Sequence, residues 1–249
     1  MLACGLIWLG PAPGLKAEVL DVPALIAVES PAEPFGLPAS ILSGGGVLQK
    51  WLGLQRRLDD ELVQLALCDG DRDGCVSPAA LKLLAIVDAA RAREGRARYG
   101  EINRAINLAI RAMSDLAQYG EIDVWASPLL TFSRGAGDCE DYAIAKLVAL
   151  RLAGIAPGDL RIVIVHDFVR GEDHAIAAAK LDGRWLTLDN RRMAMVEDVD
   201  ARHYRPIFVI DRDHAKRYEA APLLAAMPRP VPPATLSIAL APGFIAPAN

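Results

Sequence analysis

Residues 135–142 read Gly-Ala-Gly-Asp-Cys-Glu-Asp-Tyr, and the apolar run Ala-Ile-Ala-Lys-Leu-Val-Ala-Leu-Arg-Leu-Ala follows at 143–153. The glycines predict a tight turn. Residues 139–153 predict a helix that ends at Gly154. Cys139 would then lie in the first turn of a helix, where backbone N–H groups favour a thiolate and can bind an oxyanion. We therefore expect Cys139 to be a nucleophile with a lowered thiol pKa.

The chain changes from helical to strand patterns after this helix. Alternating or β-branched runs predict strands at 161–167, 174–181, 184–189 and 206–210. A helix followed by consecutive strands predicts an α+β domain with an antiparallel sheet.

The predicted hairpin brings a histidine and a carboxylate together. With Asp182-Gly183 as a two-residue turn, facing positions have numbers that sum to 365. His174 and Asp189 fall two short of that sum, so they are opposite or diagonal and can share a face. A thiol nucleophile needs a base, and the base needs a group that fixes its tautomer. Cys139, His174 and Asp189 are therefore the candidate catalytic residues.

Each of these residues also has an ordinary structural interpretation. A cysteine at a helix start is commonly a small buried residue, a strand histidine is commonly structural, and an aspartate at a strand end is commonly a turn residue. Their joint occurrence in this order favours the catalytic hypothesis. His166, beside Asp167, is a competing base, whereas His203 and His214 receive no role.

Helical patterns dominate the first half of the chain. They predict helices over 47–67, from Ser77-Pro78 to about Glu94, and over 100–118, with Asn103 and Asn107 as structural polar contacts. The expected organisation is a possible leader at 1–17, a Pro/Gly-rich lead-in at 18–46, a helical lobe at 47–120, an α+β core at 121–218 and a loosely ordered Pro/Ala-rich tail at 219–249.

Cys68 and Cys75 enclose an acidic turn, Asp-Gly-Asp-Arg-Asp-Gly at 69–74. The turn copies half of an EF-hand loop, but Ala80 stands where the bidentate glutamate should be, so a solvated turn is the better interpretation. If the protein is exported, the two cysteines form a plausible disulfide. Otherwise they are two reduced, unrelated cysteines.

Composition excludes some classes of function. The chain has 249 residues, 53% of them hydrophobic, and a net charge of −4. A chain without an excess of basic residues is not expected to bind nucleic acid. The apolar run at 2–15 is too short for a membrane span.

Four segments resemble the bacterial transglutaminase-like cysteine proteases, the LapG-like periplasmic family. They are DVWASP (123–128), GDCEDYAIAKLVAL (137–150), HAIAAA (174–179) and WLTLDN (185–190), within a resemblance that covers roughly 45–212. The resemblance implies a papain-like/transglutaminase-like cysteine hydrolase core, with the cysteine helix packed on an antiparallel sheet. It also implies a Cys-His-Asp triad at the three residues named above.

The resemblance further implies a calcium site at Asp138, Glu140 and Asp141. Clustered carboxylates suit Ca²⁺, and a bound cation would relieve their opposition to a thiolate. The alternative is that Asp138 caps the helix while Glu140 and Asp141 favour its first turn.

Enzymes of this kind cut a secreted adhesin and are held by an inner-membrane receptor that responds to cyclic di-GMP. The resemblance therefore implies an exported, periplasmic endopeptidase with a protein substrate. Three alternatives stay open: an acyltransferase with the same triad, a non-catalytic binding module, and a calcium-binding structural protein. Trp125 or Asn190 would help to shape the site.

Overall fold

The computed structural model describes residues 33–219. The predicted leader at 1–17 lies outside the described residues, as does the predicted tail beyond Glu219. None of the helices within residues 33–219 is long and apolar enough to cross a membrane.

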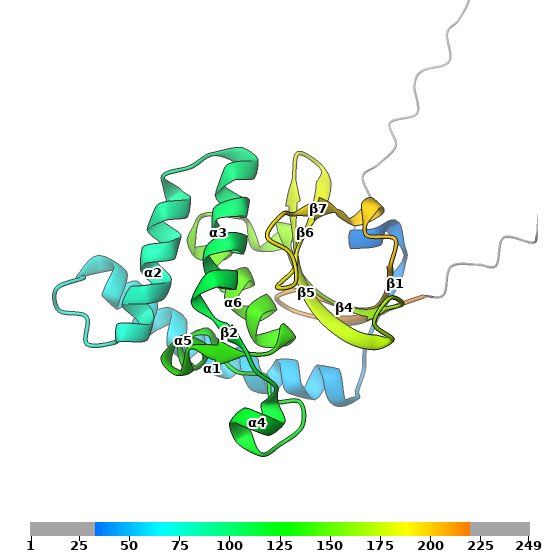
Figure 1. Ribbon diagram of the computed structural model, residues 1–249, viewed down its shortest axis with the longest axis horizontal. Helices are drawn as coiled ribbons and strands as arrows, with labels where there is room; N and C mark the ends of the chain where they lie inside the picture. The colour runs from blue at the N-terminus through cyan, green and yellow to red at the C-terminus, as the bar shows by residue number, and fades with distance from the viewer. Residues whose placement is uncertain (1–32, 220–249) are drawn as a thin grey trace, which may run out of the picture.

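Helices make up most of the first half of the described chain (Figure 1). The α-helices are α1 (Gly46–Gly70), α2 (Pro78–Arg91), α3 (Gly95–Ala109), α4 (Asp115–Tyr119), α5 (Pro128–Arg134) and α6 (Cys139–Leu152). Short 3₁₀ turns are η1 (Pro34–Gly36), η2 (Pro157–Asp159) and η3 (Asp198–Asp200).

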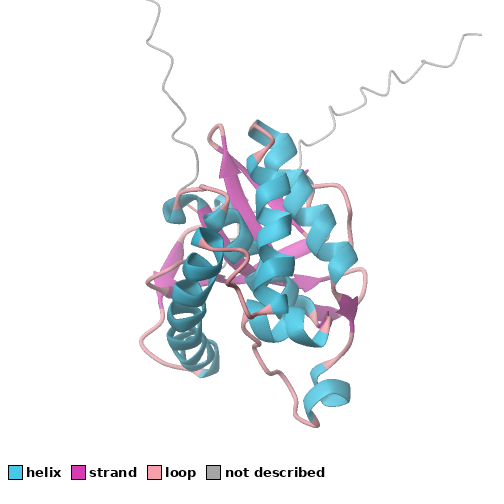
Figure 2. Ribbon diagram, turned by 90° about the vertical axis from the view of Figure 1, so that its left-hand side faces the viewer, coloured by secondary structure: helices cyan, strands magenta, loops and turns pink. Residues whose placement is uncertain are grey.

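The second half, joined by the early strand β1, forms a curled antiparallel sheet. In spatial order its strands are β1 (Ala39–Ile41), β9 (Ala215–Tyr218), β8 (Tyr204–Ile210), β4 (Leu160–Asp167), β5 (Glu172–Leu181), β6 (Arg184–Leu188) and β7 (Val196–Glu197). Two short strands, β2 (Arg111–Ala112) and β3 (Ala136–Gly137), pair in parallel beside the helices. Figure 2 shows the helices covering one side of the sheet, and the expected α+β class is confirmed.

Local sequence explains two of these elements directly. Ser77 Oγ accepts a hydrogen bond from the Ala80 N–H at 3.2 Å, so the predicted cap starts α2. Asp182 and Gly183 have φ values of 50° and 79°, as a two-residue hairpin turn requires. The β5–β6 register pairs Ala177 with Leu188, which is the predicted sum of 365.

The predicted helix over 100–118 is wrong at both ends. The helix α3 starts at Gly95 and ends at Ala109, because Ile110 takes an extended conformation. The chain then pairs with β3, where the Arg111 N–H donates to Gly135 O at 3.0 Å. This pairing between distant segments overrides local helical preference.

Part of the predicted irregular lead-in is ordered as a strand. Residues 39–41 form β1, whose partner β9 lies about 180 residues later in the chain. Long-range pairing of this kind leaves no local signal in a Pro-rich sequence.

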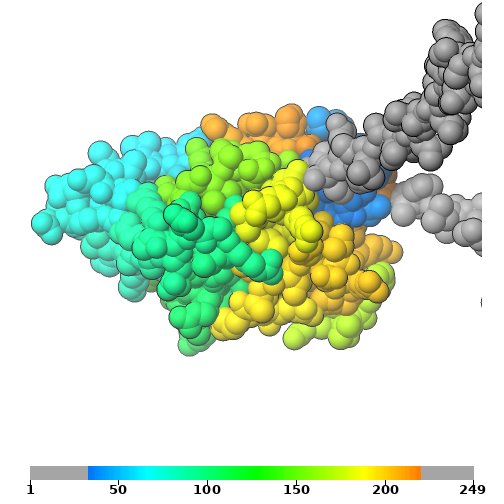
Figure 3. Space-filling model, turned by 90° about the horizontal axis from the view of Figure 1, so that it is seen from above, coloured from blue at the N-terminus to red at the C-terminus, as the bar shows by residue number. Residues whose placement is uncertain are grey.

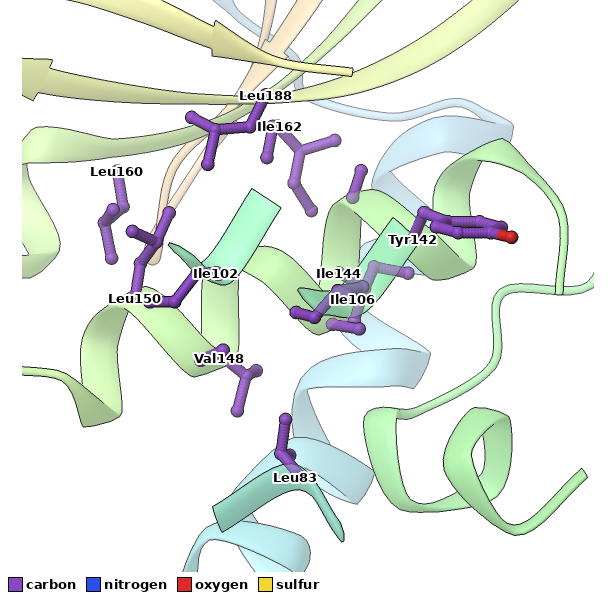
Figure 4. Close-up of a cluster of buried hydrophobic side chains, with 14 of the residues drawn as sticks. Leu83, Ile102, Ile106, Tyr142, Ile144, Val148, Leu150, Leu160, Ile162 and Leu188 are labelled. Atoms are coloured by element: carbon purple, nitrogen blue, oxygen red, sulfur yellow. The ribbon is translucent and has the colours of Figure 1, made fainter. Parts of the chain in front are cut away.

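The central helix α6 joins the two halves through one apolar core. Ile144, Val148 and Leu150 of α6 belong to the same buried cluster as Leu188 of the sheet and Ile106 of α3 (Figure 4). Figure 3 shows the helical end and the sheet end as one continuous body. Cys139 is thus positioned by the first turn of a helix whose remaining turns are fixed in the core.

Candidate active site

Cys139 is the first residue of α6 and the free cysteine of the described chain. Its thiol donates a hydrogen bond to Glu140 Oε2 at 3.1 Å. Asp138 occupies the cap position, but its side chain makes no capping bond, so the capping alternative for Asp138 is wrong. The predicted position of the cysteine in the first helical turn is confirmed.

Gly137 allows the turn before the cysteine to pack tightly. A Cβ at this position would lie 2.8 Å from the Asp141 side chain and 3.2 Å from Thr131 Cγ2. Asp141 Oδ1 accepts a hydrogen bond from the Ala126 N–H at 2.9 Å. The contact holds the segment before α5 against the start of α6.

His174 and Asp189 form a buried hydrogen-bonded pair. His174 Nε2 lies 2.9 Å from Asp189 Oδ1, and the two residues are 1% and 3% exposed. The pairing places them diagonally across the hairpin, within the arrangement that the sequence predicts. The other ring nitrogen of His174, Nδ1, is buried and has no hydrogen-bond partner.

Cys139 and His174 line the same cleft, which has a volume of ≈ 430 Å³. Trp125 and Ile164 line it as well. The backbone N–H of Ala175, the residue after His174, donates a hydrogen bond to the Cys139 sulfur, which favours the thiolate. The structure therefore brings the three predicted catalytic residues together at one site.

Asp189 receives hydrogen bonds from three further groups, of which the sequence indicated only Asn107, as a structural polar contact. The Tyr204 hydroxyl donates to Oδ2 at 2.6 Å, and the Arg191 N–H donates to Oδ1 at 2.9 Å. Asn107 Nδ2 donates to the Asp189 carbonyl at 2.9 Å. Burial opposes the charge on Asp189, but the His174 and Tyr204 contacts outweigh burial and hold the pKa of Asp189 well below its usual range.

The Tyr204 hydrogen bond predicts a measurable effect on catalysis. We expect Tyr204→Phe to lower kcat/KM about tenfold, because a hydrogen bond to a charged group is worth about 1.5–3 kcal/mol. Tyr218→Phe is the matched control. The Tyr218 hydroxyl donates to Pro34 O at 2.9 Å, and Tyr218 does not line the cleft. Steady-state kinetics on a cleaved peptide measure both variants, and equal losses in the two would contradict the role of Tyr204.

The thiol pKa differs from the expectation. Burial raises the pKa of the Cys139 thiol, and the neighbouring Glu140 carboxylate raises it further. The hydrogen bond from the Ala175 backbone N–H lowers the thiol pKa but does not overcome these two effects. A reactive thiolate therefore needs a proton acceptor and some compensation of the adjacent carboxylates.

Carboxylates do gather beside the thiol, but the set differs from the expected one. Asp115, Asp138 and Glu140 offer ligand oxygens within 4.8 Å of one another, whereas Asp141 is turned toward Ala126. Burial first, and Glu140 second, raise the pKa of Asp138 to about 9. The sequence missed Asp115 because it comes from α4, 23 positions before Asp138.

The other histidines do not line the cleft. His166 Nδ1 pairs with Asp173 Oδ1 at 2.9 Å, and the His203 ring contacts the Tyr204 ring at a tilt of 42°, with ring centroids 3.9 Å apart. His214 Nδ1 lies 3.5 Å from Asp211. His166, the competing base, does not line the cleft.

Trp125 and Asn190 also have defined places. Trp125 lines the cleft, and its indole N–H donates to Asp123 Oδ1 at 3.0 Å. Asn190 does not line the cleft. Trp125 is thus the one of the two that shapes the site.

Cys68 and Cys75, which lie outside the active site, form a disulfide across the acidic turn. Within that turn Asp69 pairs with Arg72 and Arg91, and Asp71 Oδ1 accepts the Gly74 N–H at 2.9 Å. These contacts fit a solvated acidic turn.

A helix-borne cysteine facing a sheet-borne His–Asp pair defines a transglutaminase-like cysteine hydrolase. The sequence model of the family of bacterial transglutaminase-like cysteine proteinases (BTLCP) matches residues 65–220 of this chain. The chain therefore belongs to this family and is a cysteine peptidase.

Solved structures show a similar fold. Legionella pneumophila LapG superposes with a TM-score of 0.52 at 18% identity, over 62% of this chain and 85% of that one. Its calcium-bound form superposes with a TM-score of 0.50 at 19% identity, over 58% and 82%. Among curated proteins, no sequence matches this chain.

Proposed function

We propose that this chain is an exported endopeptidase in which Cys139, His174 and Asp189 cleave a protein substrate. One observation carries the assignment of roles. His174 uses Nε2 to contact Asp189, while its buried Nδ1 has no partner in a cleft that it shares with Cys139. A ring held in this way has one nitrogen left to exchange a proton with the thiol.

The geometry supports a two-step hydrolysis. Cys139 Sγ attacks the scissile carbonyl carbon while His174 Nδ1 accepts the thiol proton. The C–N bond then breaks, His174 donates that proton to the leaving amine, and a thioester remains on Cys139. Water next attacks the thioester and gives a proton to His174, which returns it to the departing Cys139 sulfur. The backbone N–H of Cys139 would stabilise the oxyanion in both steps.

The carboxylate cluster fits a calcium ion. Asp115 Oδ1 and Asp138 Oδ1 are both buried without hydrogen-bond partners, which leaves two oxygens to be satisfied. Asp115, Asp138 and Glu140 would bind the cation through the hard oxygen ligands that Ca²⁺ prefers. When bound, the cation would neutralise charges that otherwise disfavour the Cys139 thiolate.

We expect Asp115→Asn to weaken Ca²⁺ binding at least tenfold, because ligand charge sets affinity at such sites. Titration calorimetry with CaCl₂ measures this, and the exposed Asp213→Asn is the control with the same change of charge. Equal affinity in the two variants would remove Asp115 from the site. If the native protein binds no Ca²⁺, the proposal of a calcium site fails.

Export is supported by the Cys68–Cys75 disulfide, because such bonds persist mainly in oxidising compartments. The proposed location is the periplasm. A cell-surface adhesin as substrate, and an inner-membrane receptor as regulator, are the finer proposals that rest on the family resemblance.

The test compares new protein N-termini in the cell envelope and culture medium of two strains. One strain carries the native protein and the other carries Cys139→Ala, each with and without a calcium chelator. A few specific N-termini that appear only with the native thiol would support the proposal and name the substrate. If none appears in any fraction, the endopeptidase proposal is wrong, and labelled-amine incorporation into a glutamine peptide tests acyl transfer instead.

A further inference from the structure

Lys146 is a lysine of the cysteine helix with 0% of its surface exposed. It follows Cys139 by seven residues, about two turns of α6. Its Nζ donates to the Leu188 carbonyl at 3.3 Å and lies 5.9 Å from the Tyr142 ring centroid. Within residues 33–219 it forms no ion pair with a carboxylate.

Packing alone does not explain a lysine here. Burying an ammonium group costs much more folding free energy than burying an apolar side chain of similar length, and methionine adapts well to such spaces. The surroundings are apolar, since Ala143, Ala149 and Leu150, which lie one turn from Lys146 on the same face of the helix, belong to the core. A retained charge at this cost points to a role in the adjacent site.

The side chain is directed at the end of β6 that carries Asp189. Leu188, its hydrogen-bond acceptor, immediately precedes Asp189, and Asp189 is the charged group that acts on Lys146. Asp189 in turn contacts His174 and the Tyr204 hydroxyl. The packed helix α3 contributes the neutral Asn107, which donates to the Asp189 carbonyl, and within residues 33–219 Asp189 is the charged group that shifts the pKa of Lys146.

We propose that Lys146 is a positioning residue of the active site, whose ammonium compensates the charge of Asp189 and thereby sets how strongly His174 holds a proton. The proposal rests on the roles proposed above for His174 and Asp189. It adds a further ionisable group, on the cysteine helix itself, to the buried groups behind the thiol.

Burial lowers the pKa of Lys146 to about 7, against the opposing effect of Asp189. Below that pH the ammonium compensates Asp189, so Asp189 attracts a proton onto His174 less strongly. Above that pH the amine is neutral, and the charge of Asp189 acts on His174 undiminished. The proton affinity of the base therefore changes with the state of Lys146.

Side-chain NMR of protein labelled with ¹⁵N-lysine and ¹⁵N-histidine, between pH 5.5 and 10, tests this without a substrate. Lys146→Met removes the charge, and Lys146→Gln removes the charge but keeps a donor for the Leu188 carbonyl. Arg151→Met is the matched control, because it deletes a positive charge from the same helix away from Asp189. The His174 and Lys146 signals are assigned by their loss in His174→Ala and Lys146→Met.

We expect the native Lys146 signal to change between about pH 6 and 8. In Lys146→Met and Lys146→Gln, His174 should keep its proton to a pH about one unit higher than in the native protein, and Arg151→Met should match the native protein. If His174 titrates alike in all four proteins, or if native Lys146 stays charged above pH 9, the proposal is overturned. If Lys146→Met does not fold, the titration of Lys146 in the native protein and the titration of His174 in Lys146→Gln still test the proposal. A failed cleavage assay would leave these readouts intact, so the two failures are distinguishable.

Discussion

Asp189→Asn is expected to lower kcat/KM by about 10³- to 10⁴-fold while the protein stays folded. Asp189 fixes the His174 proton on Nε2 and stabilises the imidazolium that forms when Nδ1 accepts the thiol proton. A neutral amide gives no such stabilisation. It also places an NH₂ group at one of the two oxygen positions, to which the Tyr204 hydroxyl and the Arg191 N–H donate in the native protein. The loss is measured by steady-state kinetics on a peptide that spans a mapped cleavage site.

Asp182→Asn is the control for this change, because it makes the same substitution in the same hairpin. Asp182 lies in the turn with a φ of 50°, a conformation that asparagine adopts readily. We expect it to change kcat/KM less than twofold. If Asp189→Asn keeps more than a tenth of native activity with an unchanged unfolding temperature, Asp189 does not orient the base.

Lys146→Met is expected to stabilise the protein at neutral pH, even though it alters the active site. The pKa of Lys146 is about 7 in the folded protein, against about 10.4 for an unfolded chain, so the unfolded state binds more protons between these values. The free energy of unfolding of the native protein should therefore rise with pH from about 7 to about 10. The methionine variant lacks this penalty and should be more stable at pH 7 by about 2 kcal/mol, within the range seen when buried charges become apolar.

The pH dependence separates this effect from ordinary repacking. Urea unfolding at pH 6, 8 and 10 should show the advantage of Lys146→Met shrinking toward zero as the pH rises. The difference in the free energy of unfolding between Arg151→Met and the native protein should not change with pH, because Arg151 lies near the surface at the end of α6. A variant that is less stable than the native protein by the same amount at every pH would show that Lys146 acts through packing.

The stability cost and the proposed role belong together. A buried lysine that weakens the fold is retained where function needs the charge, and such trade-offs concentrate at active sites. Cys139 illustrates the same conflict, since burial and Glu140 both oppose the thiolate that the reaction needs.

The sequence predicted the elements that depend on neighbouring residues. The Asp182-Gly183 turn determined the hairpin register, and the register put His174 diagonal to Asp189. The start of α6 at Cys139 followed from the glycine turn before it. In each case a short stretch of chain contains both the signal and the structure that it specifies.

Features that depend on distant contacts escaped prediction. The pairing of β2 with β3 ended α3 earlier than its periodicity indicated, and Asp115 reached the carboxylate cluster from a separate helix. Tyr204 contacts Asp189 from β8, the strand on the far side of β4 from β5. Lys146 drew no interpretation from the sequence, because its hydrogen bond to the Leu188 carbonyl depends on the packing of α6 on the sheet.

The most direct test of the central claim is the pH dependence of Cys139 alkylation by iodoacetamide, in native protein and in His174→Ala, with saturating Ca²⁺. If His174 is the proton partner of the thiol, native Cys139 should react about 100-fold faster than Cys139 of the variant at pH 6.5, and the gap should narrow as the pH rises and the variant thiol ionises. Identical profiles that both rise only near pH 9 would mean that Cys139 is an ordinary thiol, and the triad would be contradicted.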